Sequence, residues 1–109
     1  AGALARYYET LGGQVGYHGK PYKPFYDALL KDLDPFQKSD LLILGDSFLT
    51  DIRGAMNVNI DSLLCLSDTT AVELQIPSDE IKSTSIDLIQ EKIHDLGVVP
   101  TYIMGELTW

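Results

Sequence analysis

Several segments of the chain carry hydrophobic residues at intervals of three or four positions, a pattern that predicts amphipathic helices. The first ends at Gly12-Gly13 and the last at Gly97, and glycine commonly follows the end of a helix. Pro24 suits the first turn of another, with Phe25, Ala28 and Leu29 expected on its inner face. A further helix can be capped by Thr50 or Asp51. The helical pattern covers residues 4–11, 24–33, 51–57, 71–74 and 86–96.

Between these segments lie short hydrophobic runs that predict strands. In the run Leu41–Leu44, four consecutive hydrophobic residues indicate a strand buried on both faces, which is typical of a parallel sheet covered by helices. Similar strands are expected at Val15–Tyr17, Ile60–Leu66 and Pro100–Met104. Strands that alternate with helices predict the α/β class, with a Rossmann-like, mostly parallel sheet flanked by helices.

Composition narrows the range of partners. The 109 residues include 16 acidic and 8 basic side chains, which gives a net charge of -8. Such a surface repels phosphate backbones and anionic lipids, so neither nucleic acid nor membrane is expected as a partner. No signal-peptide pattern opens the sequence, and a single cysteine, Cys65, fits a reducing compartment. We therefore expect a cytoplasmic protein.

Three ionisable residues fall near the carboxyl ends of the predicted strands, where α/β proteins bind ligands. Lys20 follows the strand at 15–17, Asp46 follows the strand at 41–44, and Asp51 lies five residues later. Two carboxylates and a lysine could hold a divalent cation together with a phosphate group. Each residue also has an ordinary interpretation, as a solvated lysine, a turn residue or a helix cap.

Two motifs in this region resemble those of a known family. Gly19-Lys20-Pro21 and the segment Gly45–Ile52, with its pattern Gly-Asp-x-x-x-Thr-Asp, resemble the third and fourth motifs of haloacid-dehalogenase-like hydrolases. The segment Tyr8–Gly13 resembles the helix that leads back from the large α/β cap of the type IIA phosphatases. The resemblance implies a helix at the cap-to-core junction over residues 1–13 and the C-terminal part of an incomplete core domain over residues 14–109.

The resemblance also implies roles for these residues. Asp46 would help to hold Mg²⁺, and Asp51 would act on the metal site or fix the lysine. Lys20 would neutralise the phosphate and the attacking aspartate. Lys20 and Asp51 are thus the expected catalytic residues, and Asp46 and Asp51 the expected metal ligands. Ser47 and Thr50 are weaker candidates, for hydrogen bonds that shape the loop.

One part of the family pattern is not found in this sequence. The family attacks phosphate with an aspartate from an Asp-x-Asp motif after the first strand. Here Asp32-x-Asp34 lies at a predicted helix end, before Pro35, and no such motif follows a hydrophobic strand. The expected aspartyl-phosphate chemistry on a small phosphorylated metabolite would therefore require a missing N-terminal half, and the chain alone is expected to be inactive.

Two hypotheses follow from the sequence. In the first, the chain is part of a phosphatase whose exposed sheet edge pairs with the missing half, or with a second copy in a homodimer. In the second, it is a stand-alone binding module that keeps the scaffold without the chemistry. Two smaller departures from the family pattern are Asn59 and Asp68, at positions where glycine is frequent.

Overall fold

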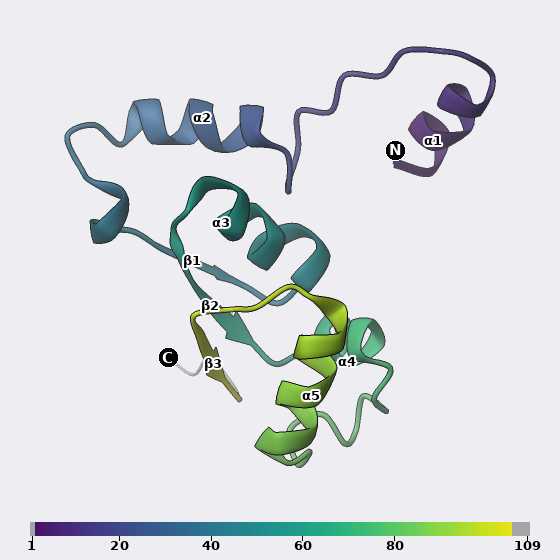
Figure 1. Cartoon of the computed structure of the whole chain (residues 1–109), viewed down its shortest axis with the longest axis vertical. Helices are drawn as coiled ribbons and strands as arrows, with labels where there is room; N and C mark the ends of the chain where they lie inside the picture. The colour runs from purple at the N-terminus through teal and green to yellow at the C-terminus, as the bar shows by residue number, and fades with distance from the viewer. Residues whose placement is uncertain (1, 106–109) are drawn as a thin grey trace.

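The computed structural model describes residues 2–105, which form helices around a short parallel sheet (Figure 1). In chain order the helices and strands are α1 (Gly2–Thr10), α2 (Lys23–Asp32), the 3-10 helix η1 (Lys38–Asp40), β1 (Leu42–Gly45), the π-helix η2 (Phe48–Ile52), α3 (Arg53–Val58), β2 (Asp61–Cys65), α4 (Asp68–Leu74), α5 (Ile86–Leu96) and β3 (Tyr102–Met104).

The sheet has the order β1-β2-β3, and both pairs of strands are parallel. Leu42 pairs with Asp61 and Leu63 pairs with Tyr102. Because parallel strands need crossover connections, η2 and α3 return the chain from β1 to β2, and α4 and α5 return it from β2 to β3. The carboxyl ends of all three strands therefore lie at one edge, and the predicted parallel α/β architecture is confirmed.

The helices bury one face of this sheet. Side chains alternate along a strand, so the pairing of Ile43 with Ser62 and of Leu64 with Ile103 places these four residues on the same face. Both hydrophobic clusters of the protein contain residues of this face. The larger cluster consists of Phe48, Ile52, Leu64, Leu66, Ala71, Leu74, Ile76, Ile81, Ile89, Ile93 and Val98, and the smaller of Tyr26, Val58 and Ile60 with Leu30, Leu41 and Ile43 packed against it.

The opposite face of the sheet is uncovered in the described residues. Leu42 is 45% exposed and Leu44 is 48% exposed, and the neighbouring Tyr102 is 55% exposed. The prediction of a strand at 41–44 was right, but the prediction that it is buried on both faces was wrong. The run places hydrophobic side chains on both faces of the sheet, whereas the helices within residues 2–105 pack against only one of these faces.

Helix α2 forms where it was predicted, but a different side of it faces inward. Tyr26 is only 2% exposed, whereas Phe25 and Leu29 are 39% and 42% exposed and Ala28 is also exposed. Tyr26 packs directly against Gly54 of α3, where a side chain would overlap the tyrosine ring. This close approach determines which face of α2 is buried, and the sequence pattern of α2 gave no sign of it.

No strand forms at residues 15–17, contrary to the prediction. Tyr17 instead stacks on Tyr22, with ring centroids 4.6 Å apart, and donates a hydrogen bond to Glu9. A hydrophobic segment forms a strand only where it runs beside another strand, and residues 15–17 pair with none of the three strands of the sheet. Helix α1 lies apart from the sheet at the end of this extended segment and has no buried residue (Figure 1).

Most helix ends agree with the sequence. Asn59 and Gly97 follow α3 and α5 with φ values of 55° and 68°, the left-handed conformation expected at these positions. The helix after β1 begins earlier than predicted, because Ser47 rather than Thr50 or Asp51 provides the cap.

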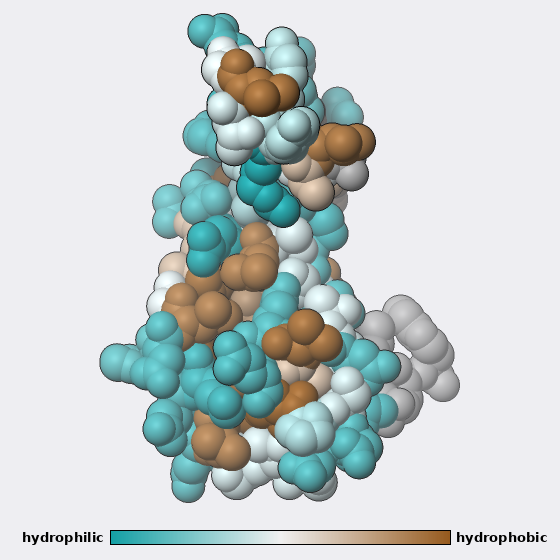
Figure 2. Space-filling view, turned by 90° about the vertical axis from the view of Figure 1, so that its right-hand side faces the viewer, coloured by the Kyte–Doolittle hydropathy of each residue, from teal (hydrophilic) through white to brown (hydrophobic). Residues whose placement is uncertain are grey.

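Hydrophobic side chains also appear on the outer surface. On the side of the molecule in Figure 2 they form separate patches between hydrophilic residues. Within residues 2–105, no helix combines the length and the hydrophobicity that crossing a bilayer requires.

Candidate functional site

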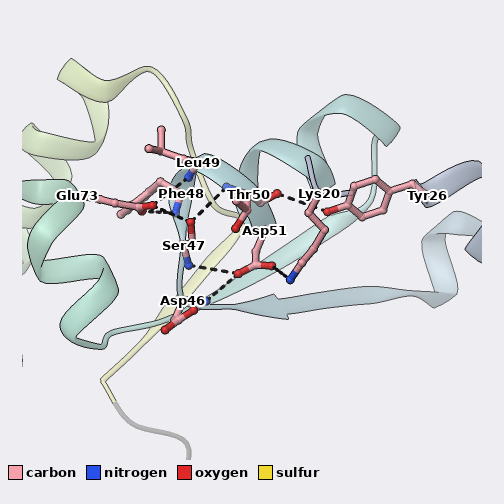
Figure 3. Close-up of polar contacts among 9 residues, drawn as sticks. All are labelled: Lys20, Tyr26, Asp46, Ser47, Phe48, Leu49, Thr50, Asp51 and Glu73. Atoms are coloured by element: carbon pink, nitrogen blue, oxygen red, sulfur yellow. Dashed lines mark hydrogen bonds and ion pairs between the residues drawn. The ribbon is translucent and has the colours of Figure 1, made fainter. Parts of the chain in front are cut away.

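The structure brings Lys20, Asp46 and Asp51 together at the carboxyl end of β1. Lys20 lies in the turn before α2, Asp46 directly follows β1, and Asp51 lies in η2. The Nζ atom of Lys20 is 2.5 Å from Oδ1 of Asp51, although the two residues are 31 positions apart in the sequence. The predicted juxtaposition of a lysine with two carboxylates is therefore present in the structure (Figure 3).

Both oxygens of the Asp51 carboxylate have partners. Oδ1 accepts from Lys20, and Oδ2 accepts from the backbone N–H groups of Asp46 and Ser47, each at 3.3 Å. The Asp51 side chain is 8% exposed, whereas that of Lys20 is 47% exposed. Asp51 thus anchors the lysine from the protein side, while about half of the lysine side chain stays exposed.

Gly45 makes this arrangement possible. A Cβ atom at position 45 would overlap the side chain of Asp51. Because glycine has no side chain, the carboxylate can lie directly over the end of β1 and reach the backbone of the loop. The first position of the Gly-Asp-x-x-x-Thr-Asp pattern therefore needs a glycine, because any larger residue would displace the Asp51 side chain.

The ion pair changes the electrostatics of the lysine. The hydrogen bond that Lys20 donates to Asp51 raises the pKa of Lys20 above its ordinary value, and partial burial opposes this only in part. Burial, followed by the charge of Asp51, raises the pKa of the neighbouring Tyr26. At neutral pH Lys20 therefore carries a full positive charge.

Asp46 is held by residues that follow β2. Its Oδ2 atom accepts a hydrogen bond from Ser67 Oγ at 2.8 Å, and its backbone carbonyl accepts one from Thr70 Oγ1 at 2.7 Å. Ser67 is also the N-cap of α4, because its side chain accepts from the backbone of Thr69 and Thr70. These contacts fix Asp46 relative to the neighbouring strand end.

Glu73 of α4 contributes to the site, and the sequence analysis missed it. Its carboxylate accepts hydrogen bonds from Ser47 Oγ at 2.7 Å, from Phe48 N at 2.5 Å and from Leu49 N at 3.5 Å (Figure 3). It therefore satisfies the free N–H groups at the start of η2. Glu73 is 24 to 26 positions from these partners, and no local pattern in the sequence marks such a contact.

The loop residues that were weaker candidates take part in the same network. Ser47 Oγ donates to Glu73 and accepts from Thr50 N at 3.2 Å. The backbone carbonyl of Thr50 lies 3.5 Å from the hydroxyl of Tyr26. Both residues shape the loop, as expected, through hydrogen bonds within the protein.

The oxygen donors suit a magnesium ion only in part. Mg²⁺ prefers hard oxygen ligands and is commonly bound by one or two carboxylates with water completing the shell. Asp46 offers such a carboxylate, whereas both oxygens of Asp51 are already hydrogen-bonded. Among residues 2–105, no group of three or more His, Cys, Asp or Glu side chains is arranged to hold a metal ion. The described residues could thus provide some, but not all, of the protein ligands of a magnesium site.

Comparison with known proteins shows what this chain is similar to. A solved structure described as a possible sugar phosphatase of the HAD superfamily, from Cytophaga hutchinsonii, is similar to 96% of this chain with 28% sequence identity and a TM-score of 0.58. The chain spans 34% of the length of that protein. No curated protein matches the sequence significantly. The model of the HAD-hydrolase-like family matches residues 17–95, which include Lys20, Asp46, Asp51 and Glu73. The chain therefore belongs to the HAD-hydrolase-like family.

Proposed function

We propose that this chain provides the lysine and the acidic loop of a Mg²⁺-dependent phosphatase that acts on a small phosphorylated metabolite. The observation that carries the proposal is the pairing of Lys20 with Asp51 beside Asp46 at the strand ends. A membership in the HAD-hydrolase-like family and a neighbour described as a possible sugar phosphatase support it. On the sequence arguments given above, we also propose that the protein belongs to the type IIA subfamily and is located in the cytoplasm.

Each residue has a distinct role in this proposal. The Lys20 ammonium group binds the phosphoryl oxygens and balances the negative charge that grows in the transition state. Asp51 holds the lysine in place and supports the backbone of the loop. Asp46 would provide a carboxylate ligand to the metal. Magnesium, when bound, would supply positive charge to the phosphoryl oxygens.

The nucleophile of the proposed reaction is an aspartate from a polypeptide segment outside this sequence. The edge of β1 is open in the described residues, and a further parallel strand there would end beside Asp46. The uncovered sheet face, with Leu42, Leu44 and Tyr102, offers a surface on which such a segment could pack. The chain alone is accordingly proposed to be inactive.

Phosphate binding tests the roles of the residues present. The chain is titrated with inorganic phosphate in the presence of Mg²⁺, and amide shifts are followed by NMR. We expect shifts in the loop 45–51, and we expect Lys20→Met to weaken binding about fivefold or more, because a charge-assisted contact is lost. Lys31→Met is the matched control, since Lys31 is exposed at the end of α2. Equal affinity for both variants would remove Lys20 from the phosphate site.

The source of the nucleophile is tested through the gene. The coding DNA upstream of the Ala1 codon is sequenced, and any in-frame segment with Asp-x-Asp after a hydrophobic strand is expressed and mixed with this chain. We expect Mg²⁺-dependent hydrolysis of a phosphate monoester by the mixture and none after Lys20→Met. If no such segment exists, or if a folded mixture stays inactive, the protein is a binding module instead.

A further inference from the structure

We infer that the cavity beside Lys20 is a subsite for a second anionic group of the phosphorylated ligand. This inference rests on the proposed function for the phosphate end of the ligand. It adds the class of substrate, which is a phosphate monoester that also carries a carboxylate or a second phosphate.

The cavity is formed by segments that are distant in the sequence. Helix α1, the loop before α2, η2 and α3 together line an open cavity of about 750 Å³. Cavities of this size accommodate small molecules. Lys20 lines it, whereas neither Asp46 nor Asp51 does. The cavity therefore extends from the lysine on the side away from the two acidic residues.

The charge of this cavity is opposite to that of the whole chain. The chain has eight basic residues and a net charge of -8, yet Arg6, Lys20 and Arg53 all line this one cavity. Its other lining residues are Gly2, Tyr17, Gly19, Pro21, Tyr22, Leu49, Thr50 and Asn57, so no carboxylate is among them. A concentration of positive charge in an acidic protein attracts anions to this place and away from the rest of the surface.

The two arginines are available to a ligand. Among the described residues, neither Arg6 nor Arg53 forms an ion pair with a carboxylate, whereas Lys20 pairs with Asp51 and Lys23 pairs with Asp27. A guanidinium group presents a planar fork of N–H donors that matches a carboxylate or a phosphate. The free arginines thus have the donor geometry that a second anionic group requires.

Arg53 has the more direct connection with the phosphate end. It is the first residue of α3 and follows Asp51 by two positions, so the segment that holds the lysine also places this arginine. Arg6 approaches from α1, and the stacked rings of Tyr17 and Tyr22 also line the cavity. A ligand that extends from Lys20 into the cavity meets one or both guanidinium groups.

Two matched pairs of ligands test this inference on the chain itself. Glycerol 3-phosphate and 3-phosphoglycerate differ in one terminal group, which is neutral in the first and a carboxylate in the second. Fructose 6-phosphate and fructose 1,6-bisphosphate differ by a second phosphate. Binding is measured by calorimetry at constant ionic strength with Mg²⁺ present. We expect the ligand with the second anion to bind about five- to tenfold tighter in at least one pair.

Variants locate the source of the preference. Arg53→Gln and Arg6→Gln together should make the two affinities equal within a pair that shows the preference, and Lys31→Gln should leave every affinity unchanged. Which pair shows the preference identifies the second group as carboxylate or phosphate. Equal affinity within both pairs, or a preference that survives loss of both arginines, would overturn the subsite.

The same measurements separate this inference from the proposed function. If glycerol 3-phosphate binds through Lys20 but neither pair shows a preference, the phosphate site stands and the subsite falls. If the preference depends on the arginines but Lys20→Met changes no affinity, the subsite stands and the assigned phosphate site falls. Absence of binding by all four ligands would overturn both.

Discussion

At the last position of β1, Gly45 leaves the space in which the Asp51 carboxylate lies over the strand end. Gly45→Ala would push a methyl group into that carboxylate and move it away from Lys20 and from the loop backbone. We expect a loss of about 1–3 kcal/mol in the free energy of unfolding, the usual cost of overpacking a tight site. Urea denaturation measures it, and the Phe48 and Asp51 amide resonances report the local displacement.

Gly105→Ala is the control for this substitution, because a Cβ atom there meets no atom within 4 Å. If both alanine variants are equally stable and the loop resonances stay in place, Asp51 does not lie over the strand end.

The Lys20–Asp51 pair also makes a prediction about pH. Since the folded-state pKa of Lys20 is raised above the unfolded value, the pair stabilises the protein fully below the ordinary lysine pKa. Its contribution is lost only as the pH rises through the folded-state pKa of Lys20, which lies above the ordinary lysine pKa. At neutral pH the contribution is therefore fully present. NMR titration of ¹³C-labelled lysine should show that Lys20 titrates at a higher pH in the wild-type chain than in the Asp51→Asn variant. Identical titration of Lys20 in the two chains would contradict the pair.

At the scale of the elements, Glu73 connects α4 to the start of η2. Its carboxylate accepts from two backbone N–H groups and one hydroxyl, so Glu73→Gln replaces charge-assisted hydrogen bonds with weaker neutral ones. We expect a loss of about 1–2 kcal/mol in the free energy of unfolding and an upfield shift of the Phe48 amide proton.

Glu91→Gln is the matched variant, because Glu91 is exposed on α5. A Phe48 proton that does not move in Glu73→Gln would show that the contact is absent in solution.

The open edge of β1 favours self-association. An unpaired strand edge with exposed hydrophobic side chains can pair with another chain, and a lysine there prevents it. We therefore predict a concentration-dependent homodimer in sedimentation experiments, which Leu44→Lys should shift to monomer. Val72→Lys, at a residue 73% exposed on α4, should leave the dimer intact. A wild-type chain that stays monomeric at high concentration would refute the predicted homodimer.

At the scale of the whole molecule, the chain exposes more surface than its size requires. Its accessible surface is 7457 Å², against roughly 6000 Å² for a compact protein of the same mass. Two features described above contribute to this extra surface. Helix α1 has no buried residue, and one face of the sheet is uncovered in the described residues.

Local sequence patterns were sufficient for most of the helices and strands and for the expectation that Lys20, Asp46 and Asp51 lie close together. Glycine and asparagine at helix ends, the hydrophobic run at 41–44 and the two motifs around Lys20 and Asp51 each depend on neighbours in sequence. What failed depends on distant contacts. Residues 15–17 lack a pairing strand, Tyr26 is buried because Gly54 is small, and Glu73 acts on a loop more than twenty positions away. Periodicity carries no information about such partners.

The uncovered sheet face also has a calorimetric consequence. The heat capacity change of unfolding measures the hydrophobic surface that becomes newly hydrated, and averages about 12–15 cal/mol/K per residue. Leu42, Leu44 and Tyr102 already contact water in the folded chain, so their hydration changes less on melting. The isolated chain should therefore show a flatter temperature dependence of its unfolding enthalpy than its length suggests, and covering that face with another polypeptide should restore the ordinary curvature.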